Sequence, residues 1–366
     1  MPASDARNLV LIAAGGTGGH LFPAEALAIA LDKRGIVVDL ATDHRAAHFK
    51  FPARAMHLIP SATLRGRDPI SVVRTLMLLA FGSAKAWALL GRIKPKVVVG
   101  FGGYPTVPPL LAASWRNIPT VLHEQNGVMG RANGFLAPRV TAIATGFRVL
   151  KNFNRRWQNK ITFTGNPLRP QVIAAGNMPY AVPADGKLRL LVFGGSQGAR
   201  VMSEIVPAAI GLLDAGLGMR LSIVQQARAE DLETVRAAYA RLWVAAEVAS
   251  FFADLPARMA ASHLVISRSG ASTVAELSAI GRPAILVPLP HALDQDQFAN
   301  AGVLEAAGGA IRIEQREFTA ERLAKEITTL SNDPARLLKM AQAAKSCGTV
   351  DAAERLADLV IKVAGI

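Results

Sequence analysis

The chain has 366 residues, of which 51% are hydrophobic and 19% are charged. This composition excludes global disorder and supplies enough apolar surface for a large core, which we expect to be divided between two domains. The one cysteine, Cys347, excludes a disulfide framework and argues against a cysteine-based metal site.

The formal net charge of +14 is unevenly placed. Residues 1–170 hold 22 Lys and Arg against 7 Asp and Glu, a net charge of +15, whereas residues 171–366 sum to −1. We therefore expect a polyanionic partner for the first half alone, either nucleic acid or an anionic membrane surface. The N-terminal segment MPASDARN lacks the apolar run of a signal peptide, and the longest charge-free stretch, 97–115, is interrupted by glycines and prolines. These features predict a cytoplasmic protein without a membrane-spanning helix.

Strands and helices alternate along the first half of the chain. Apolar runs predict strands at 8–14, 37–41, 97–100 and 120–123, with a helix at 21–34. The polar segment 176–187 predicts a linker, after which LRLLVFGGSQGAR repeats the order of strand, glycines and helix. The pattern predicts an α/β protein with two Rossmann-like domains built on parallel sheets.

The first predicted strand is followed by a glycine-rich turn, GGTGGH, at 15–20. Glycines between a strand and a helix let backbone N–H groups approach an anion at the positive end of the helix dipole, and phosphate is the expected ligand. The turn is neither the dinucleotide fingerprint nor a P-loop. The alternative is a tight turn that needs glycine only for its dihedral angles, although the related loops at 194–199 and 267–277 weaken that reading.

The segment Arg65–Lys96 mixes aliphatic side chains at roughly helical spacing with seven arginines and lysines. One interpretation is a core helix with solvated basic ends. The other is an amphipathic or hairpin element that lies at the headgroup level of a membrane, with its cations on lipid phosphates. Because nucleic-acid surfaces rarely expose so much aliphatic bulk, the segment favours a membrane over nucleic acid.

A third loop, SRSGASTVAEL at 267–277, also leads from an apolar run into a helix. Its hydroxyl and backbone donors suit a phosphate, and Glu276, about one turn further on, suits the vicinal hydroxyls of a ribose. Glu276 could alternatively serve only to cap the helix or oppose its dipole.

Seven motifs occur in a fixed order: GGTGGH, GFGGYPT, HEQN, TGNPLR, FGGSQGAR, SRSGASTVAE and DQDQFANAG. From about residue 8 to 350 the chain thereby resembles the MurG family, the lipid II-forming N-acetylglucosaminyltransferases of peptidoglycan synthesis. The resemblance implies a two-domain GT-B fold with an inter-domain cleft. Residues 1–168, joined by a C-terminal helix at 345–366, would form an acceptor-binding and membrane-facing domain, and 169–344 a UDP-sugar-binding domain.

The activity implied by this resemblance is inverting transfer of N-acetylglucosamine from UDP-N-acetylglucosamine to the muramoyl 4-hydroxyl of lipid I, the undecaprenyl-diphosphate-linked acceptor. The product would be lipid II, which links the protein to cell-wall synthesis, cell shape and cell division. The implied location is peripheral, at the cytoplasmic face of the inner membrane, with an anionic lipid surface contacted through Arg65–Lys96 and no nucleic-acid partner.

The resemblance also implies the residues of the donor site. The diphosphate would bind Ser196 and the turn at 270–273, and the ribose would bind Glu276. The uracil would contact the backbone of Phe252. The sugar hydroxyls would bind Asn126 and Gln297, and Asp294 and Gln295 are the alternative candidates for the role of Gln297. The full implied set is Thr17, Gly18, Gly19, Asn126, Arg169, Ser196, Phe252, Ala271, Ser272, Thr273, Val274, Ala275, Glu276 and Gln297.

Inverting transfer needs a base for the acceptor hydroxyl and positive potential for the departing UDP. His20 is one candidate base, since its reference pKa of roughly 6.5 suits neutral pH, and Glu124 is the other. His20 could instead simply cap or pack on its helix. The D-x-D pattern at 294–296 could hold a metal ion, but three helix starts can supply the positive potential, so we expect no bound metal and no cofactor. The rival functions are a UDP-N-acetylglucosamine 2-epimerase and a non-catalytic nucleotide- or membrane-binding protein.

Overall fold

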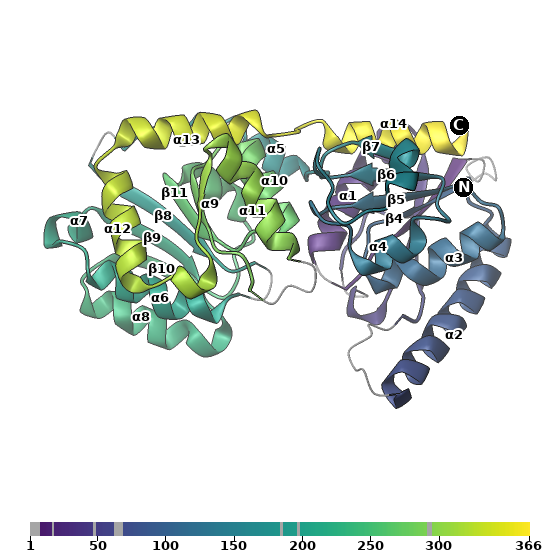
Figure 1. Cartoon of the computed structure of the whole chain (residues 1–366), viewed down its shortest axis with the longest axis horizontal. Helices are drawn as coiled ribbons and strands as arrows, with labels where there is room; N and C mark the ends of the chain where they lie inside the picture. The colour runs from purple at the N-terminus through teal and green to yellow at the C-terminus, as the bar shows by residue number, and fades with distance from the viewer. Residues whose placement is uncertain are drawn as a thin grey trace. The chain divides into compact units, whose positions relative to one another are not determined.

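The computed structural model describes residues 8–16, 18–46, 49–61, 69–183, 186–195, 198–290 and 295–366 (Figure 1). The chain forms two compact units: residues 1–169 with 350–366, and residues 170–349. Each unit has its own parallel sheet with helices packed on it, which confirms the predicted α/β class with two Rossmann-like domains.

Unit 1 holds a seven-stranded sheet in the order β3-β2-β1-β4-β5-β6-β7. Every strand pairs in parallel with its neighbours. The strands are β1 (Leu9–Ala13), β2 (Val37–Thr42), β3 (Ala55–Leu58), β4 (Val97–Gly100), β5 (Thr120–Glu124), β6 (Ala142–Thr145) and β7 (Ile161–Phe163), and the helices are α1 (Gly18–Asp32), α2 (Pro69–Ile93), α3 (Val107–Trp115), α4 (Arg131–Leu136) and α14 (Ala352–Ala364).

Both faces of this sheet are covered, which explains why its central strands are apolar without alternation. Successive side chains of β1 point to opposite faces. Val10 and Ile12 join the core beneath α1 and α14, whereas Leu11 and Ala13 join the core beneath α2 and α3. The C-terminal helix α14 is fixed to α1 by ion pairs from Arg34 as well as by this core.

Unit 2 holds a six-stranded parallel sheet in the order β10-β9-β8-β11-β12-β13. The strands are β8 (Leu188–Phe193), β9 (Leu221–Gln226), β10 (Ala245–Ala249), β11 (Leu264–Ser267), β12 (Ala284–Leu286) and β13 (Ala310–Arg312). The helices are α5 (Pro170–Ala175), α6 (Arg200–Gly211), α7 (Ala215–Met219), α8 (Leu232–Arg241), α9 (Leu255–Ala261), α10 (Ala271–Ile280), α11 (Asp296–Ala307), α12 (Ala320–Ser331) and α13 (Pro334–Ser346).

The segment 176–187, predicted to be a linker, lies inside unit 2 because the chain leaves unit 1 after Arg169. The buried cation Arg282 explains why this segment belongs to unit 2 and is not a linker. The Arg282 guanidinium, 1% exposed, donates to carbonyl oxygens of 178 and 179 in that segment and to those at the ends of α9 and α10. Helix C-termini carry partial negative charge, so the carbonyl groups compensate the guanidinium without a carboxylate.

Helix α2 turns much of its apolar surface outward. It packs along α3 (Figure 1), yet Leu76, Met77 and Phe81 are 56%, 67% and 55% exposed. The buried face contains Thr75 and Ser83, whose hydroxyls donate to carbonyl oxygens one turn earlier in the same helix, and further along the apolar Ala86, Leu89 and Leu90, which join the core. The interpretation of this segment as a core helix thus holds only for its C-terminal part, whereas residues 76–81 turn apolar side chains outward. The cations at 65 and 67 lie outside the described residues.

By length and composition, residues 71–93 of α2 could cross a membrane. Core helices of globular proteins reach the same length and apolar composition. The helix is joined to the body of unit 1 along α3, and a side chain at Gly82 would meet the Pro60 carbonyl oxygen. Such close packing on the protein is consistent with a surface element rather than a spanning one.

Candidate functional site

The loops that carry the glycine motifs begin where each sheet reverses its strand order. In unit 1, β1 and β4 lie side by side; β2 is the other neighbour of β1, and β5 is the other neighbour of β4. In unit 2, β8 and β11 have the same relation. In open parallel sheets ligands bind beyond the carboxyl ends of the strands at this reversal. The sequence motifs that follow these four strands therefore lie where the topology favours ligand binding.

In unit 1 the site is built from the loops that follow β1, β4 and β5. His20 is the third residue of α1, and its Nδ1 lies 3.2 Å from the Nε2 atom of Gln125, just after β5. The same Gln125 nitrogen donates to the Phe101 carbonyl oxygen, just after β4, at 3.1 Å. One side chain amide thus joins all three loops at the reversal.

His20 is half-buried, and its surroundings disfavour a charged imidazole. Burial lowers the pKa of His20 below its ordinary value, an effect opposed by the Phe101 backbone and reinforced by the Arg45 guanidinium. A Cβ atom placed on Gly103 would lie 3.3 Å from His20 Nε2, and Gly103 has a φ of 72°. Glycine at 103 thus leaves the Nε2 edge of the ring uncrowded.

Glu124, the other candidate base, is the last residue of β5 and is buried. Its carboxylate accepts hydrogen bonds from the backbone and side chain of Asn126, from the Gly130 N–H at 3.0 Å and from Asn133 Nδ2 at 2.7 Å. Burial raises the pKa of the Glu124 carboxyl, while these N–H donors oppose that rise. The arrangement holds the loop from 126 to 133 in place, including the predicted sugar-binding Asn126.

The remaining unit 1 candidates lie on or beside α1. Gly18 and Gly19 form its first turn, and Thr17 lies outside the described residues. The Arg169 guanidinium stacks 3.8 Å from the centre of the Phe22 ring and lies close enough to Glu25 to act on its charge. Arg169, expected at the start of the donor domain, is therefore the last residue of unit 1.

In unit 2 the turn after β11 is tied to the start of α11. Ser269 Oγ donates to the Gln297 carbonyl oxygen at 2.8 Å, and Asn300 Nδ2 donates to the Ser269 carbonyl oxygen at 3.2 Å. The Gln297 side chain oxygen in turn accepts from the Leu289 N–H at 3.1 Å. These bonds bring the predicted sugar-binding Gln297 beside the predicted phosphate-binding turn.

Helix α10 begins directly after this turn, with Gly270 as its N-cap residue. The first N–H groups of the helix belong to Ala271, Ser272 and Thr273. They point out of its N-terminal end, where the positive end of the helix dipole favours an anion. The side chain of Val274 is buried, so a ligand would contact Val274 through its backbone. Ala275 is half-buried.

Glu276 lies in the second turn of α10 and is 8% exposed. Phe252 follows β10 at the same edge of the sheet, with its ring buried and the Arg258 guanidinium 4.3 Å from the ring centre. Its side chain is thus used in packing, as expected if its backbone contacts the base. Ser196 and Asp294 lie outside the described residues.

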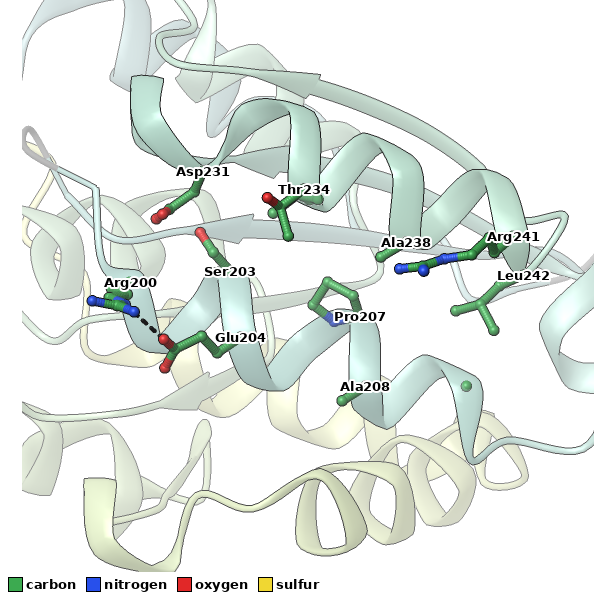
Figure 2. A pocket seen from close by; sticks show the side chains of 12 residues that line it. Arg200, Ser203, Glu204, Pro207, Ala208, Asp231, Thr234, Ala238, Arg241 and Leu242 are labelled. Carbon is green, nitrogen blue, oxygen red and sulfur yellow. Dashed lines mark hydrogen bonds and ion pairs between the residues drawn. The ribbon is translucent and has the colours of Figure 1, made fainter.

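Two further features of unit 2 bear on ligand binding. A groove of about 580 Å³ lies between α6 and α8 and is lined among others by Arg200, Glu204 and Arg241 (Figure 2). None of the predicted site residues lines it. Within the described ranges, no three His, Cys, Asp or Glu side chains gather as a metal-binding group. Asp296 of the D-x-D pattern accepts a hydrogen bond from the Gln297 N–H.

Two residues of the unit 1 site are not among the candidates predicted from the sequence. Gln125 joins the three loops, and Asn133 binds Glu124. Gln125 lies within the HEQN motif, between Glu124, predicted as a base, and Asn126, predicted as a sugar ligand. Asn133 lies outside the quoted motifs, and the turn from β5 into α4 brings it back to Glu124.

Comparison with known proteins gives a consistent result over nearly the whole chain. The model of the glycosyltransferase family 28 N-terminal domain matches residues 10–145, and that of the C-terminal domain matches residues 189–356. A relative from Rhodopseudomonas palustris is 60% identical over 364 residues, covering 98% of this chain and 99% of the relative. It is named UDP-N-acetylglucosamine–N-acetylmuramyl-(pentapeptide) pyrophosphoryl-undecaprenol N-acetylglucosamine transferase.

Solved structures agree with this similarity. The crystal structure of MurG from Acinetobacter baumannii has a TM-score of 0.77 at 29% identity and covers 97% of this chain and 99% of that one. The UDP-GlcNAc 2-epimerase of Neisseria meningitidis, bound to UDP-GlcNAc, has a TM-score of 0.62 at 17% identity, covering 97% of this chain and 100% of that one. The second likeness shows a common fold alone, so fold does not separate a transferase from an epimerase.

Proposed function

Because the chain belongs to glycosyltransferase family 28, we propose that it transfers N-acetylglucosamine from UDP-N-acetylglucosamine to lipid I, with inversion, to form lipid II. The observation that carries this proposal is the 60% identity, over 98% of the chain, to a transferase named for that donor and that acceptor. The match includes both sheets and both pairs of loops at the strand-order reversals.

Unit 2 is proposed to bind the donor. The start of α10, with its capping Gly270 and the hydroxyls of 272 and 273, offers N–H and O–H donors to the diphosphate, as does Ser196. Glu276 would accept hydrogen bonds from the ribose, and the Phe252 backbone would contact uracil. Gln297, held beside this turn through Ser269, would bind a sugar hydroxyl. Asn126 of unit 1 is also proposed to bind a sugar hydroxyl.

Unit 1 is proposed to bind the acceptor and to supply the groups that act at the transferred bond. Gly18 and Gly19, in the first turn of α1, are proposed as donor-binding positions through their backbone N–H groups, and Thr17 is proposed for the same role. Of His20 and Glu124, one is proposed to take the acceptor proton and the other to orient or stabilise the reacting groups. Arg169, at the end of the unit, adds positive charge beside α1.

We further propose that the apolar face of α2 docks on the cytoplasmic leaflet of the inner membrane. Three exposed apolar side chains, Leu76, Met77 and Phe81, share the helix with cations at 74, 85 and 92. Leu58 of β3 and Trp115 of α3 are also more than half exposed. This combination suits a peripheral element that buries apolar groups in an anionic bilayer, where the lipid-linked acceptor is held.

The test is to incubate the purified protein with UDP-N-acetylglucosamine and a lipid I analogue and to identify the products by mass spectrometry. A lipid-linked disaccharide supports the transferase. Formation of N-acetylmannosamine without the analogue would instead support the epimerase, and absence of any product would leave a binding protein.

Variants separate the two proposed half-sites. Glu276→Ala is expected to weaken donor binding measured by calorimetry, because the ribose loses its acceptor. His20→Ala is expected to abolish transfer with nearly unchanged donor affinity. Unchanged turnover of the second variant would remove His20 from the mechanism.

A further inference from the structure

The hydrogen bonds around Gln125 determine which of its side chain atoms faces His20. A backbone carbonyl can only accept a hydrogen bond, so the Gln125 atom 3.1 Å from the Phe101 carbonyl oxygen must be the amide nitrogen. The reverse orientation would place two oxygens against each other. Because the nitrogen is thereby fixed, the atom that lies 3.2 Å from His20 Nδ1 is also a donor.

An amide nitrogen carries two protons, one for each of these partners. The proton directed at His20 requires a lone pair on Nδ1. In a neutral imidazole one nitrogen is protonated and the other is not, so the proton lies on Nε2. We propose that Gln125 is a positioning residue that holds His20 in the tautomer protonated at Nε2, so that its Nε2 edge offers a hydrogen-bond donor to a substrate oxygen.

The consequence for the chemistry rests on the proposed transferase function, whereas the tautomer assignment does not. A neutral His20 in this form has no lone pair on Nε2, the edge beside Gly103. It therefore cannot take the proton of an acceptor hydroxyl from that edge. Its Nε2–H is instead suited to stabilise negative charge on a phosphate or a departing oxygen.

The other groups around the ring agree with a neutral His20. Protonation of Nδ1 would set an N–H against the Gln125 N–H. The charged and titratable neighbours are Arg45, on the segment after β2, and His123 of β5. Burial and the Arg45 charge lower the pKa of His20, whereas a hydrogen bond between the ring and the Phe101 backbone raises it; the pKa remains below its ordinary value. Burial lowers the pKa of His123 to about 4, so His123 is neutral at pH 7 as well.

His123 also provides an internal reference. Its Nε2 lies 3.1 Å from the Gly165 carbonyl oxygen, so that nitrogen must carry the proton when the ring is neutral. Neither Gln125 nor Phe101 is its partner in that bond. Its tautomer should be unaffected by a change at 125.

The experiment is nitrogen-15 NMR of the imidazole rings in the full-length protein at pH 7.5, with the His20 signals assigned by their loss in His20→Asn. We expect His20 to show a pyrrole-type Nε2 and a pyridine-type Nδ1, as His123 does. A pyrrole-type Nδ1 at His20 in the unmodified protein would overturn the proposal, whatever the variants do.

Gln125→Glu is the sharpest variant, because a carboxylate accepts where the amide donates. The proton should move to Nδ1 of His20, and the pKa of His20 should rise, while the His123 signals stay unchanged. Gln125→Met, which neither donates nor accepts there, should leave a mixture of the two tautomers. If Gln125→Glu folds with the His20 tautomer unchanged, Gln125 does not position the ring.

Kinetics add a separate readout. With Gln125→Glu we expect kcat to fall by about 10²-fold, the typical effect of losing one transition-state donor, with donor affinity retained. In this variant only the charged imidazolium carries an Nε2–H, so the residual activity should rise as the pH falls through the raised pKa of His20. Unchanged kcat with a reversed tautomer would overturn the donor role. An Nε2–H tautomer in a protein that makes no disaccharide would contradict the proposed function and leave the tautomer assignment intact.

Discussion

Replacing Leu76, Met77 and Phe81 together by serine should weaken membrane binding without unfolding the protein. Full burial of one such side chain is worth roughly 1.5–3 kcal/mol. With 56%, 67% and 55% of these side chains exposed, complete coverage by lipid would contribute about 3–5 kcal/mol in total. If the bilayer covers half of that surface, the loss is about 1.3–2.7 kcal/mol, or roughly 10- to 100-fold in affinity.

The assay is cosedimentation with vesicles that contain anionic lipid. A matched control removes two apolar side chains of unit 2, Met219 and Trp243, which are 79% and 92% exposed, by replacement with serine. The control should bind vesicles normally, and neither variant should change the free energy of unfolding by more than about 0.5 kcal/mol per site. Equal binding by both variants, or a large loss of stability in the α2 variant, would refute the membrane-facing assignment.

Three further predictions concern buried charged groups. Arg282→Met should lower the free energy of unfolding in urea by about 3–5 kcal/mol, because several buried carbonyl groups lose their donor; a loss below about 1 kcal/mol would contradict that role. Glu124→Gln should lower both stability and turnover, because an NH₂ group would face N–H donors, whereas loss of turnover at full stability would instead indicate a base. Although burial opposes it, hydrogen bonds from Arg54 and His57 lower the pKa of Asp39, so its contribution to stability is present above pH 3.8 and is lost as the pH falls through the native pKa. Asp39→Asn should therefore flatten the acid limb of the stability profile measured by thermal unfolding, and an unchanged limb would exclude Asp39 as its cause.

Local patterns were enough to predict four strands of the unit 1 sheet, β1, β2, β4 and β5, but not β3, β6 and β7. The run at 97–100 predicts β4 residue for residue, because a strand buried on both faces reads as a continuous apolar segment. The glycine loops could be placed for a related reason, since each directly follows such a strand. The sequence did not reveal the outer face of α2, because periodicity describes which residues share a side but not what covers that side.

The remaining differences arise from contacts between residues far apart in the chain. The segment 176–187 has the composition of a linker, yet Arg282, about a hundred residues later, binds its carbonyl groups. Gln125 meets His20 only because β5 lies next to β4, which lies next to β1. Motif spacing carries no information on that order, so the joining of the three loops required the folded structure.

The central claim is acceptor-dependent transfer, and release of UDP from UDP-N-acetylglucosamine tests it most directly. The measurement compares the purified protein with and without a lipid I analogue in the same vesicles. We predict UDP release only when the analogue is present, in equal amounts with a lipid-linked disaccharide. Donor consumption that is independent of the analogue, with N-acetylmannosamine as a product, would contradict the account.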